Sequence, residues 1–167
     1  MDSLMPTTGS SLYIMLLANQ PDQKLPLPIA WTNLTASYFA LNNIEAAEAA
    51  TKNALDLTRQ EKIPTQEAVA LGHLGLIRAR QGRIGDALHY LHTAVSKAED
   101  LRDLWNAQHW YRDIANLYTW TGLPELALEN FEKALALSRK VGDHRSEGIC
   151  LFQLRNEEAL VDAVSIS

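Results

Sequence analysis

The 167-residue sequence predicts an all-α protein in which pairs of helices stack into a solenoid. Three observations predict this fold. Alanines recur at intervals of forty residues, apolar residues inside each unit have helical spacing, and no segment has the alternating pattern of a β-strand. The alanines form two registers, Ala47, Ala87 and Ala127 in one and Ala54, Ala94 and Ala134 in the other.

Turn residues divide each forty-residue unit into two helices. Asn42, Gly82 and Gly122 stand where the apolar periodicity breaks, and each suits the left-handed backbone conformation that ends a helix. We therefore predict a helical hairpin around each of them. The predicted pairs are 28–41 with 44–60, 66–81 with 84–100, and 104–121 with 124–140, and a last helix covers 144–162.

Local signals support these helix limits. The first helix carries an apolar face made of Trp31, Leu34, Tyr38 and Leu41. Signals for later starts are Pro64-Thr65, Asp103, Pro124 in a first-turn position, and Gly142-Asp143. In the last helix, Arg155 replaces an expected small residue and Glu158 replaces an expected aromatic one, so we predict that this helix caps the stack.

Small residues indicate close packing within each pair. Two antiparallel helices approach closely only where no bulky side chain separates their backbones. The alanine of the second helix, such as Ala87, faces a small residue of the first helix in each predicted pair. Those partners are Thr35, Gly75 and Ala115.

Composition and charge argue against several classes of protein. The formal net charge of -5 and the lack of a dense Lys/Arg run argue against nucleic-acid binding. The apolar stretch from Leu12 to Ala18 is too short to span a bilayer and lacks the basic flank of a secretory signal. The single cysteine, Cys150, fits a reducing compartment, so the cytoplasm is the expected location.

In these residues the sequence resembles the tetratricopeptide repeat (TPR), whose pattern combines a large aromatic residue, Leu-Gly and Tyr in one helix with spaced alanines in the next. The matching residues are Trp31, Leu34 and Tyr38, then Leu74 and Gly75, then Tyr118, Gly122, Ala127, Phe131 and Ala134. The usual repeat has about 34 residues, so a forty-residue step resembles a lengthened variant.

The resemblance implies a right-handed α-solenoid of three TPR-like helix pairs plus a C-terminal capping helix. The implied divisions are an N-terminal segment, 1–27, with a short apolar helix, then repeats at about 28–67, 68–107 and 108–143, then a capping helix and tail at 144–167.

The resemblance also implies that the first helix of each pair lines a concave groove. Its groove-facing positions include Thr32 and Gly72, and the groove is apolar in its first half and polar with aromatic residues in its second half. The residues expected to contact a partner are Phe39, Leu76, Arg80, His109, Arg112, Asn116, Trp120, Phe152, Gln153 and Asn156.

The expected function is therefore that of an adaptor, which binds a peptide or a helix of a partner protein in this groove. Two alternatives remain: a scaffold that self-assembles through the solenoid ends, and a sensor of a signalling peptide or small molecule. Chaperone-tail recognition is not expected, because Thr32 and Ala36 replace the Lys and Asn that it needs. The N-terminal segment SLYIMLLANQ could instead fold over the apolar half of the groove, with the arginines as ordinary solvated charges.

Residues for chemistry are sparse. Asp86, His89 and His92 have a spacing that permits zinc binding, but the same pattern is common on polar helix surfaces, and we expect no metal. No nucleophile motif surrounds Cys150, and no phosphate-binding loop is present. We expect no catalytic residue, no cofactor and no enzyme activity.

Overall fold

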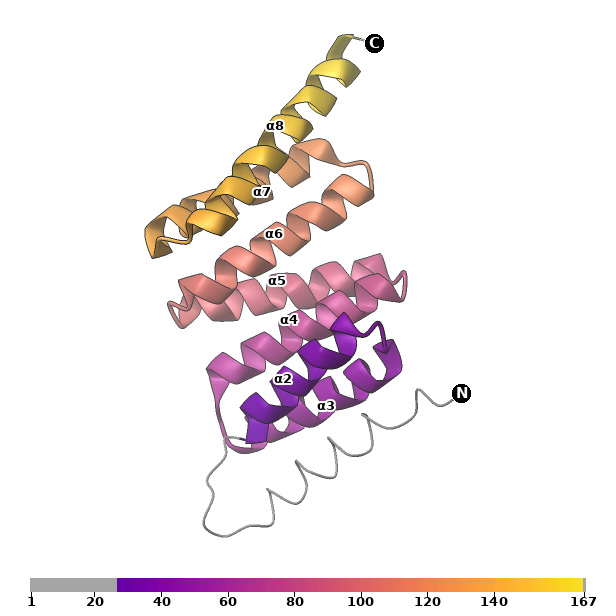
Figure 1. The fold of residues 1–167 in the computed structure, drawn as a ribbon, viewed down its shortest axis with the longest axis vertical. Helices are drawn as coiled ribbons and strands as arrows, with labels where there is room; N and C mark the ends of the chain where they lie inside the picture. The colour runs from indigo at the N-terminus through magenta and orange to yellow at the C-terminus, as the bar shows by residue number, and fades with distance from the viewer. Residues whose placement is uncertain (1–26, 167) are drawn as a thin grey trace.

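The computed structural model describes residues 27–166, and every regular element in that part of the chain is a helix. The helices are α2 (Leu27–Ala40), α3 (Ile44–Gln60), α4 (Pro64–Arg80), α5 (Ile84–Asp100), α6 (Leu104–Trp120), α7 (Pro124–Val141) and α8 (His144–Ile166). They stack along the long axis as an α-solenoid, from α2 at one end to α8 at the other (Figure 1). The apolar helix expected in the N-terminal segment lies outside the described residues.

The predicted helix limits agree with the structure to within two residues, except at the end of α8, which continues to Ile166. The interpretation of Pro64-Thr65 as residues that precede the helix was wrong. α4 begins at Pro64, because proline is tolerated in the first turn, where a backbone N–H would have no partner within the helix. Thr65 therefore lies inside α4 and does not cap it. Asp103 does cap α6, since its carboxylate accepts a hydrogen bond from the Asn106 backbone N–H at 3.2 Å.

The helices are joined by turns of one geometry. The predicted turn residues Asn42, Gly82 and Gly122 are left-handed, with φ of 57°, 74° and 74°. Lys62 and Arg102, both with φ of 56°, have the same conformation between pairs, and neither was predicted. In each turn the next residue donates its backbone N–H to a carbonyl five residues earlier, as in Arg83 to Arg78 at 2.9 Å. These bonds satisfy carbonyls that the helix end leaves without partners.

The small residues lie where the two helices of a pair meet, as predicted. Ala47, Ala87 and Ala127 are fully buried. A Cβ atom added to Gly75 would lie 2.7 Å from Leu91 Cγ and 3.1 Å from the Ala87 carbonyl oxygen. A side chain at this position would therefore displace Leu91 and press against the α5 backbone.

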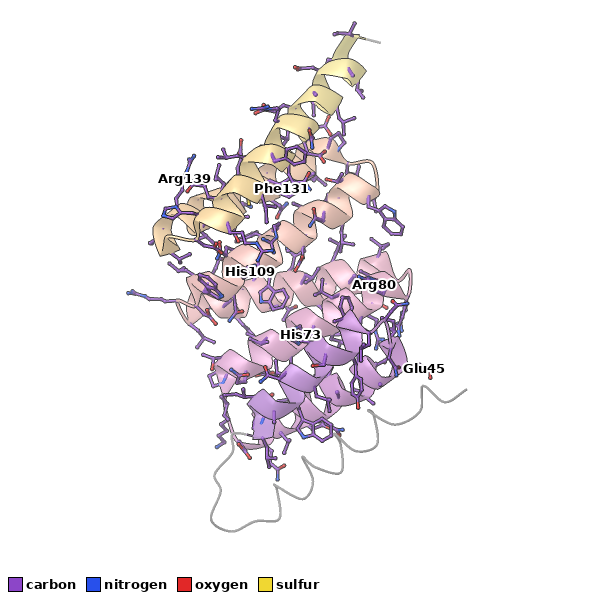
Figure 2. All side chains as sticks on the ribbon, viewed as in Figure 1. Glu45, His73, Arg80, His109, Phe131 and Arg139 are labelled. Atoms are coloured by element: carbon purple, nitrogen blue, oxygen red, sulfur yellow. The ribbon has the colours of Figure 1, made fainter. Side chains whose placement is uncertain are left out.

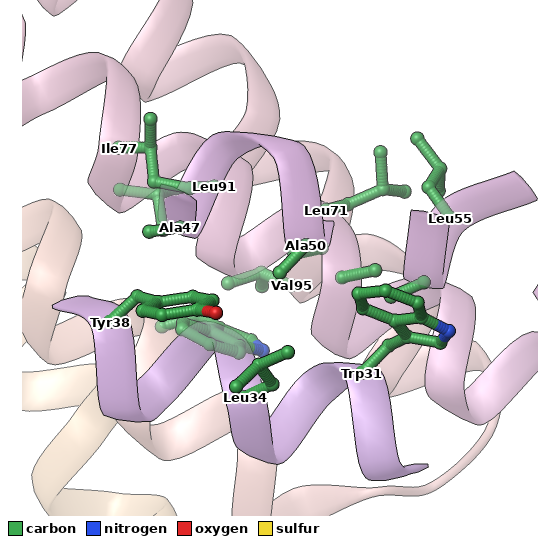
Figure 3. Packing of buried hydrophobic residues seen from close by; sticks show 14 of the residues in the cluster. Trp31, Leu34, Tyr38, Ala47, Ala50, Leu55, Leu71, Ile77, Leu91 and Val95 are labelled. Atoms are coloured by element: carbon green, nitrogen blue, oxygen red, sulfur yellow. The ribbon is translucent and has the colours of Figure 1, made fainter. Parts of the chain in front are cut away.

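The buried apolar residues form two clusters. The larger one lies mainly under α2 to α5, where Trp31, Leu34 and Tyr38 pack against the alanines of α3 (Figure 3). The smaller one lies under α6, α7 and α8, and Phe131 is its largest member, with none of its surface exposed. Tyr111 and Tyr118 of α6 pack against both clusters.

The helices form two layers of different spacing. α2 packs directly on α4, and α4 on α6, whereas α3, α5 and α7 make few or no direct contacts with one another. The face formed by α2, α4, α6 and α8 is called the inner face below, and it is the face that the repeat resemblance implies to be concave.

α8 takes the place of a first helix and differs from the earlier ones. Arg155 is exposed, whereas the corresponding Thr35, Gly75 and Ala115 are buried. Glu158 is also exposed, whereas the corresponding Tyr38 is buried. The turn register of Asn42, Gly82 and Gly122 falls at Asp162, and α8 runs straight through it. The charged side chains suit a surface that faces solvent, as expected of a capping helix.

Candidate functional site

The inner face carries a small hollow between α2 and α4. Thr35, Ala36, Phe39, Ala40, His73 and Leu76 line this α2–α4 hollow, which has a volume of about 170 Å³. Its walls are mostly apolar, and Phe39 and Leu76 are only partly buried. Pockets for drug-sized ligands measure roughly 300 Å³ or more, so a hollow of this size fits one side chain.

Arg80 stands at the rim of the hollow. Its guanidinium lies 4.6 Å from the centre of the Phe39 ring, a cation–π contact, and donates to Asn42 Oδ1 at 3.3 Å. Among the described residues, Arg80 has no carboxylate partner. The hollow therefore combines apolar walls with a positive charge that is open to solvent.

His73 forms one wall of the hollow and was not predicted from the sequence. Burial lowers the pKa of His73 to about 4, so the ring is neutral at pH 7. Its Nδ1 atom is buried without a hydrogen-bond partner in the described part of the chain. The ring meets the Trp110 indole edge to face, with centroids 5.9 Å apart. His73 and the inner-face residues Arg80 and His109 are labelled in Figure 2.

Trp110 occupies space that the sequence predicts to be the middle of the groove. Its indole lies against Gly72, where an added Cβ would overlap the ring. Gly72 is therefore a packing position rather than a groove position. Thr32, also expected in the groove, is buried and donates its hydroxyl to the Pro28 carbonyl at 2.9 Å.

A second cavity lies between α6 and the start of α8. Trp105, His109, Arg112, Asp143, Arg145, Ser146 and Ile149 line this α6–α8 cavity, whose volume is about 430 Å³. Arg112 donates to Ser146 Oγ at 3.2 Å and contacts His109 Nδ1 at 3.1 Å. The structure thus brings the predicted His109 and Arg112 together, and it adds Trp105, Arg145 and Ser146.

The charges of the α6–α8 cavity follow from its hydrogen bonds. Burial and the nearby Arg112 charge lower the pKa of His109, so its ring is neutral at pH 7 and accepts from Arg112. Hydrogen bonds from Ser146 hold the pKa of Asp143 below its usual range. Asp143 is therefore ionised, and its oxygens accept from the Ser146 backbone N–H and from Gln108 Nε2, each at 3.0 Å.

The other predicted contact residues lie on the inner face outside both depressions. Trp120 is 69% exposed and Phe152 is 65% exposed. Asn116 and Asn156 are also exposed, and Gln153 is partly buried. Near them Thr119 donates to Glu157 at 2.5 Å, which ties α6 to α8. These residues extend the inner face without forming a third cavity.

Asp113, on α6 of the inner face, is a partly buried carboxyl group with no hydrogen-bond partner among the described residues. Desolvation raises the pKa of Asp113 to about 6, and the nearby positive charge of Arg112 limits this increase. The Asp113 carboxyl has a lower pKa in the unfolded chain than in the folded chain, so between these two values the folded chain binds more protons. The free energy of unfolding therefore falls as the pH rises from about 4 to about 6, and it stays low above that range.

Asp113→Asn is therefore expected to stabilise the protein by about 1–2 kcal/mol at pH 7.5 and to have little effect at pH 4. Urea unfolding at both pH values would measure this difference. His73 has the opposite pH dependence, because a buried neutral imidazole is protonated on unfolding, so the variant must be compared with the wild type at each pH. The exposed Asp56→Asn change should have little effect, and equal stabilisation by Asp113→Asn at both pH values would contradict the assignment.

The interhelical ion pairs of the described residues join helices of one layer to helices of the other. Glu48 bonds Arg78 at 2.9 Å, and Glu67 bonds Arg59 at 3.1 Å. Within residues 27–166, no three His, Cys, Asp or Glu side chains are placed to share a metal ion, including Asp86, His89 and His92. No helix in this part of the chain is both long and apolar enough to cross a membrane.

The fold defines the class of protein, a helical-repeat α-solenoid, and its inner face carries two depressions. The sequence pattern of the tetratricopeptide repeat family matches residues 109–141. That segment covers most of α6 and all of α7. This segment of the chain therefore matches one tetratricopeptide repeat, and the described residues have a TPR-like α-solenoid fold.

Several solved structures share this fold. Aspartyl phosphate phosphatase F from Bacillus subtilis superposes with a TM-score of 0.79 at 20% identity, over 96% of this chain and 42% of the phosphatase chain. BtubC (BKLC) from P. vanneervenii has a TM-score of 0.61 at 14% identity, over 93% of this chain and 72% of its own. A kinesin light chain with TPR-like repeats from Podosopora anserina gives 0.67 at 14% identity, over 96% and 84%.

This chain thus spans less than half of the phosphatase chain. At these identities the likeness concerns the fold alone. No curated protein sequence matches the chain.

Proposed function

We propose that this protein is a non-enzymatic binding module, which holds a peptide or a helix of a partner protein on its inner face. The observation that carries the proposal is the α2–α4 hollow, an open apolar depression with Arg80, which has no carboxylate partner among the described residues, at its rim. Solvent-exposed apolar hollows are costly to keep in water and are typical of interaction sites.

The rest of the inner face supports an extended contact. Arg112, like Arg80, has no carboxylate partner in residues 27–166, and Trp120 and Phe152 are largely exposed. Aromatic and arginine side chains supply much of the binding energy at protein interfaces. The tetratricopeptide fold is typical of protein-interaction modules, which agrees with this role.

Within this proposal the repeats are 28–67, 68–107 and 108–143, and 144–167 is the cap. The cytoplasm remains the proposed location. The self-assembling scaffold and the sensor of a signalling peptide or small molecule remain predictions from the sequence.

Replacing Arg112 and Trp120 together by alanine is expected to abolish capture of the native partner, because the change removes a cation and an exposed aromatic anchor from one face. Affinity purification from the producing cells, followed by mass spectrometry, would compare the variant with the wild type. Thermal unfolding would verify that the variant remains folded.

A second variant tests the hollow itself. Ala36 is exposed and lines the hollow, so Ala36→Leu should fill it without disturbing the core. The matched control is Ala49→Leu, at an exposed position of α3 on the other layer. Unchanged capture by both inner-face variants would contradict the groove proposal.

A further inference from the structure

The α6–α8 cavity is lined by two arginines, Arg112 and Arg145, which form no ion pair with a carboxylate among the described residues. Arg112 is held by neutral groups only, the Ser146 hydroxyl at 3.2 Å and the His109 ring at 3.1 Å. These contacts fix the direction of the guanidinium without cancelling its charge. Arg145 lines the same cavity, is exposed, and has no carboxylate partner in the described part of the chain.

We propose that the α6–α8 cavity binds the side-chain carboxylate of an aspartate or glutamate that belongs to the same partner peptide as the apolar residue in the α2–α4 hollow. This inference rests on the proposed function. It adds the chemistry of a second anchor, which is an acidic residue, and its distance from the first along the peptide.

The charge of the cavity favours a carboxylate over a phosphate. Arg112 and Arg145 contribute two positive charges, and Asp143, which lines the same cavity, contributes one negative charge. The lining residues therefore carry a balance of one positive charge, which a carboxylate neutralises; Asp113 lies near Arg112 but does not line the cavity. A phosphate dianion would leave excess negative charge beside Asp143, and like charges at this range repel.

Hydrogen-bond accounting favours a side chain over a chain terminus. A C-terminal carboxylate would carry its own backbone N–H into the cavity, where that group needs an acceptor. The main acceptor present is Asp143, whose oxygens already accept from the Ser146 backbone and Gln108. An Asp or Glu side chain reaches Arg112 while its backbone stays at the rim, beside Trp105 and Ile149, which are 53% and 37% exposed.

The geometry of the stack sets the spacing of the two anchors. The hollow lies between α2 and α4 and the cavity between α6 and α8, so their centres are two helix spacings apart across the inner layer. Packed helices are about 8–10 Å apart, which gives roughly 20 Å across the layer. The cavity also lies about nine residues earlier along its helices than the hollow, which adds an offset of about 14 Å and gives a direct distance of about 24 Å. An extended peptide advances about 3.3 Å per residue, so the acidic residue should lie about seven residues from the apolar one.

The test uses synthetic peptides with acetylated and amidated ends, a Ser/Gln background, one leucine, and one glutamate moved from three to ten residues away on either side. Fluorescence anisotropy measures binding to the full-length protein. Affinity should peak at a spacing of about five to eight residues in one direction and fall about tenfold when that glutamate is replaced by glutamine.

Protein variants locate the acidic anchor. Arg112→Gln and Arg145→Gln should each reduce the preference for glutamate over glutamine while leaving the dependence on leucine intact. Arg155→Gln, which removes an exposed arginine of α8 outside the cavity, should leave both unchanged. Ala36→Leu should reduce the dependence on leucine.

The possible failures are distinguishable. If binding depends on leucine and on Ala36→Leu but is equal for glutamate and glutamine at every spacing, the inference is wrong and the proposed function stands. Tighter binding of a phosphoserine peptide, or of a peptide with a free C-terminus at the same spacing, would also overturn the carboxylate side-chain assignment. Binding that depends on neither leucine nor Ala36→Leu would overturn both proposals.

Discussion

The Gly75→Val variant is expected to lose about 3 kcal/mol of unfolding free energy, because the new side chain has no space at the α4–α5 contact. A Cβ at this position already lies 2.7 Å from Leu91 Cγ and 3.1 Å from the Ala87 carbonyl oxygen, closer than van der Waals contact. The Leu91 side chain could shift, but the α5 backbone cannot move without separating the pair. Urea unfolding followed by circular dichroism would measure the loss.

Gly148→Ala provides a matched control for Gly75. Gly148 lies inside α8, and an added Cβ there would meet no atom within 4 Å. This change is expected to stabilise the protein by about 0.5–1 kcal/mol, since alanine loses less backbone entropy than glycine in a helix. A valine at 75 with wild-type stability would show that the α4–α5 pair is more loosely packed than described.

The Phe131→Ala variant is expected to lose about 3–5 kcal/mol and to unfold in two steps. Phe131 is the largest side chain of the smaller cluster, so its truncation leaves a cavity under α6, α7 and α8 (Figure 2). The larger cluster does not contain Phe131. The C-terminal part of the solenoid should therefore melt first.

Two probes would separate these steps. Circular dichroism reports all helices. With the exposed Trp105 and Trp120 replaced by phenylalanine, the fluorescence of the buried Trp31 and Trp110 reports mainly the larger cluster, to which both belong. In the variant, the circular dichroism signal should change at lower urea than the fluorescence. Leu126→Ala, at a 40% exposed position of α7, should cost less than about 1 kcal/mol. Coincident transitions for Phe131→Ala would show that the two clusters unfold as one unit.

The fold could be predicted from the sequence because its signals repeat. Ala47, Ala87 and Ala127 mark the same contact in three pairs, and each occurrence supports the others. The left-handed Lys62 and Arg102 were missed for a physical reason, since neither residue type favours that conformation. At these two positions the packing of the flanking helices requires the turn, and the local sequence gives no signal for it.

The candidate site could be predicted only in part. Helical position placed Phe39, Leu76 and Arg112 on the inner face, because spacing along a helix fixes its direction. Helical position did not identify His73, which lies one position outside the expected groove residues. It also did not identify Arg145, which comes to line the same cavity as Arg112 only because α8 lies beside α6. Gly72 was misplaced because the volume of Trp110, which lies on another helix, cannot be read from the spacing within α4.

The left-handed residues recur every twenty positions, at 42, 62, 82, 102, 122 and 142. This interval has a consequence for how the chain tolerates changes in length. One residue added inside a helix would rotate everything after it by about 100° and turn its apolar face toward water, whereas residues added at a turn leave each helix intact. The protein should therefore still fold when residues are inserted at its ends or around these six turns. Whole forty-residue units could also be gained or lost, because each new contact would be of a kind already present.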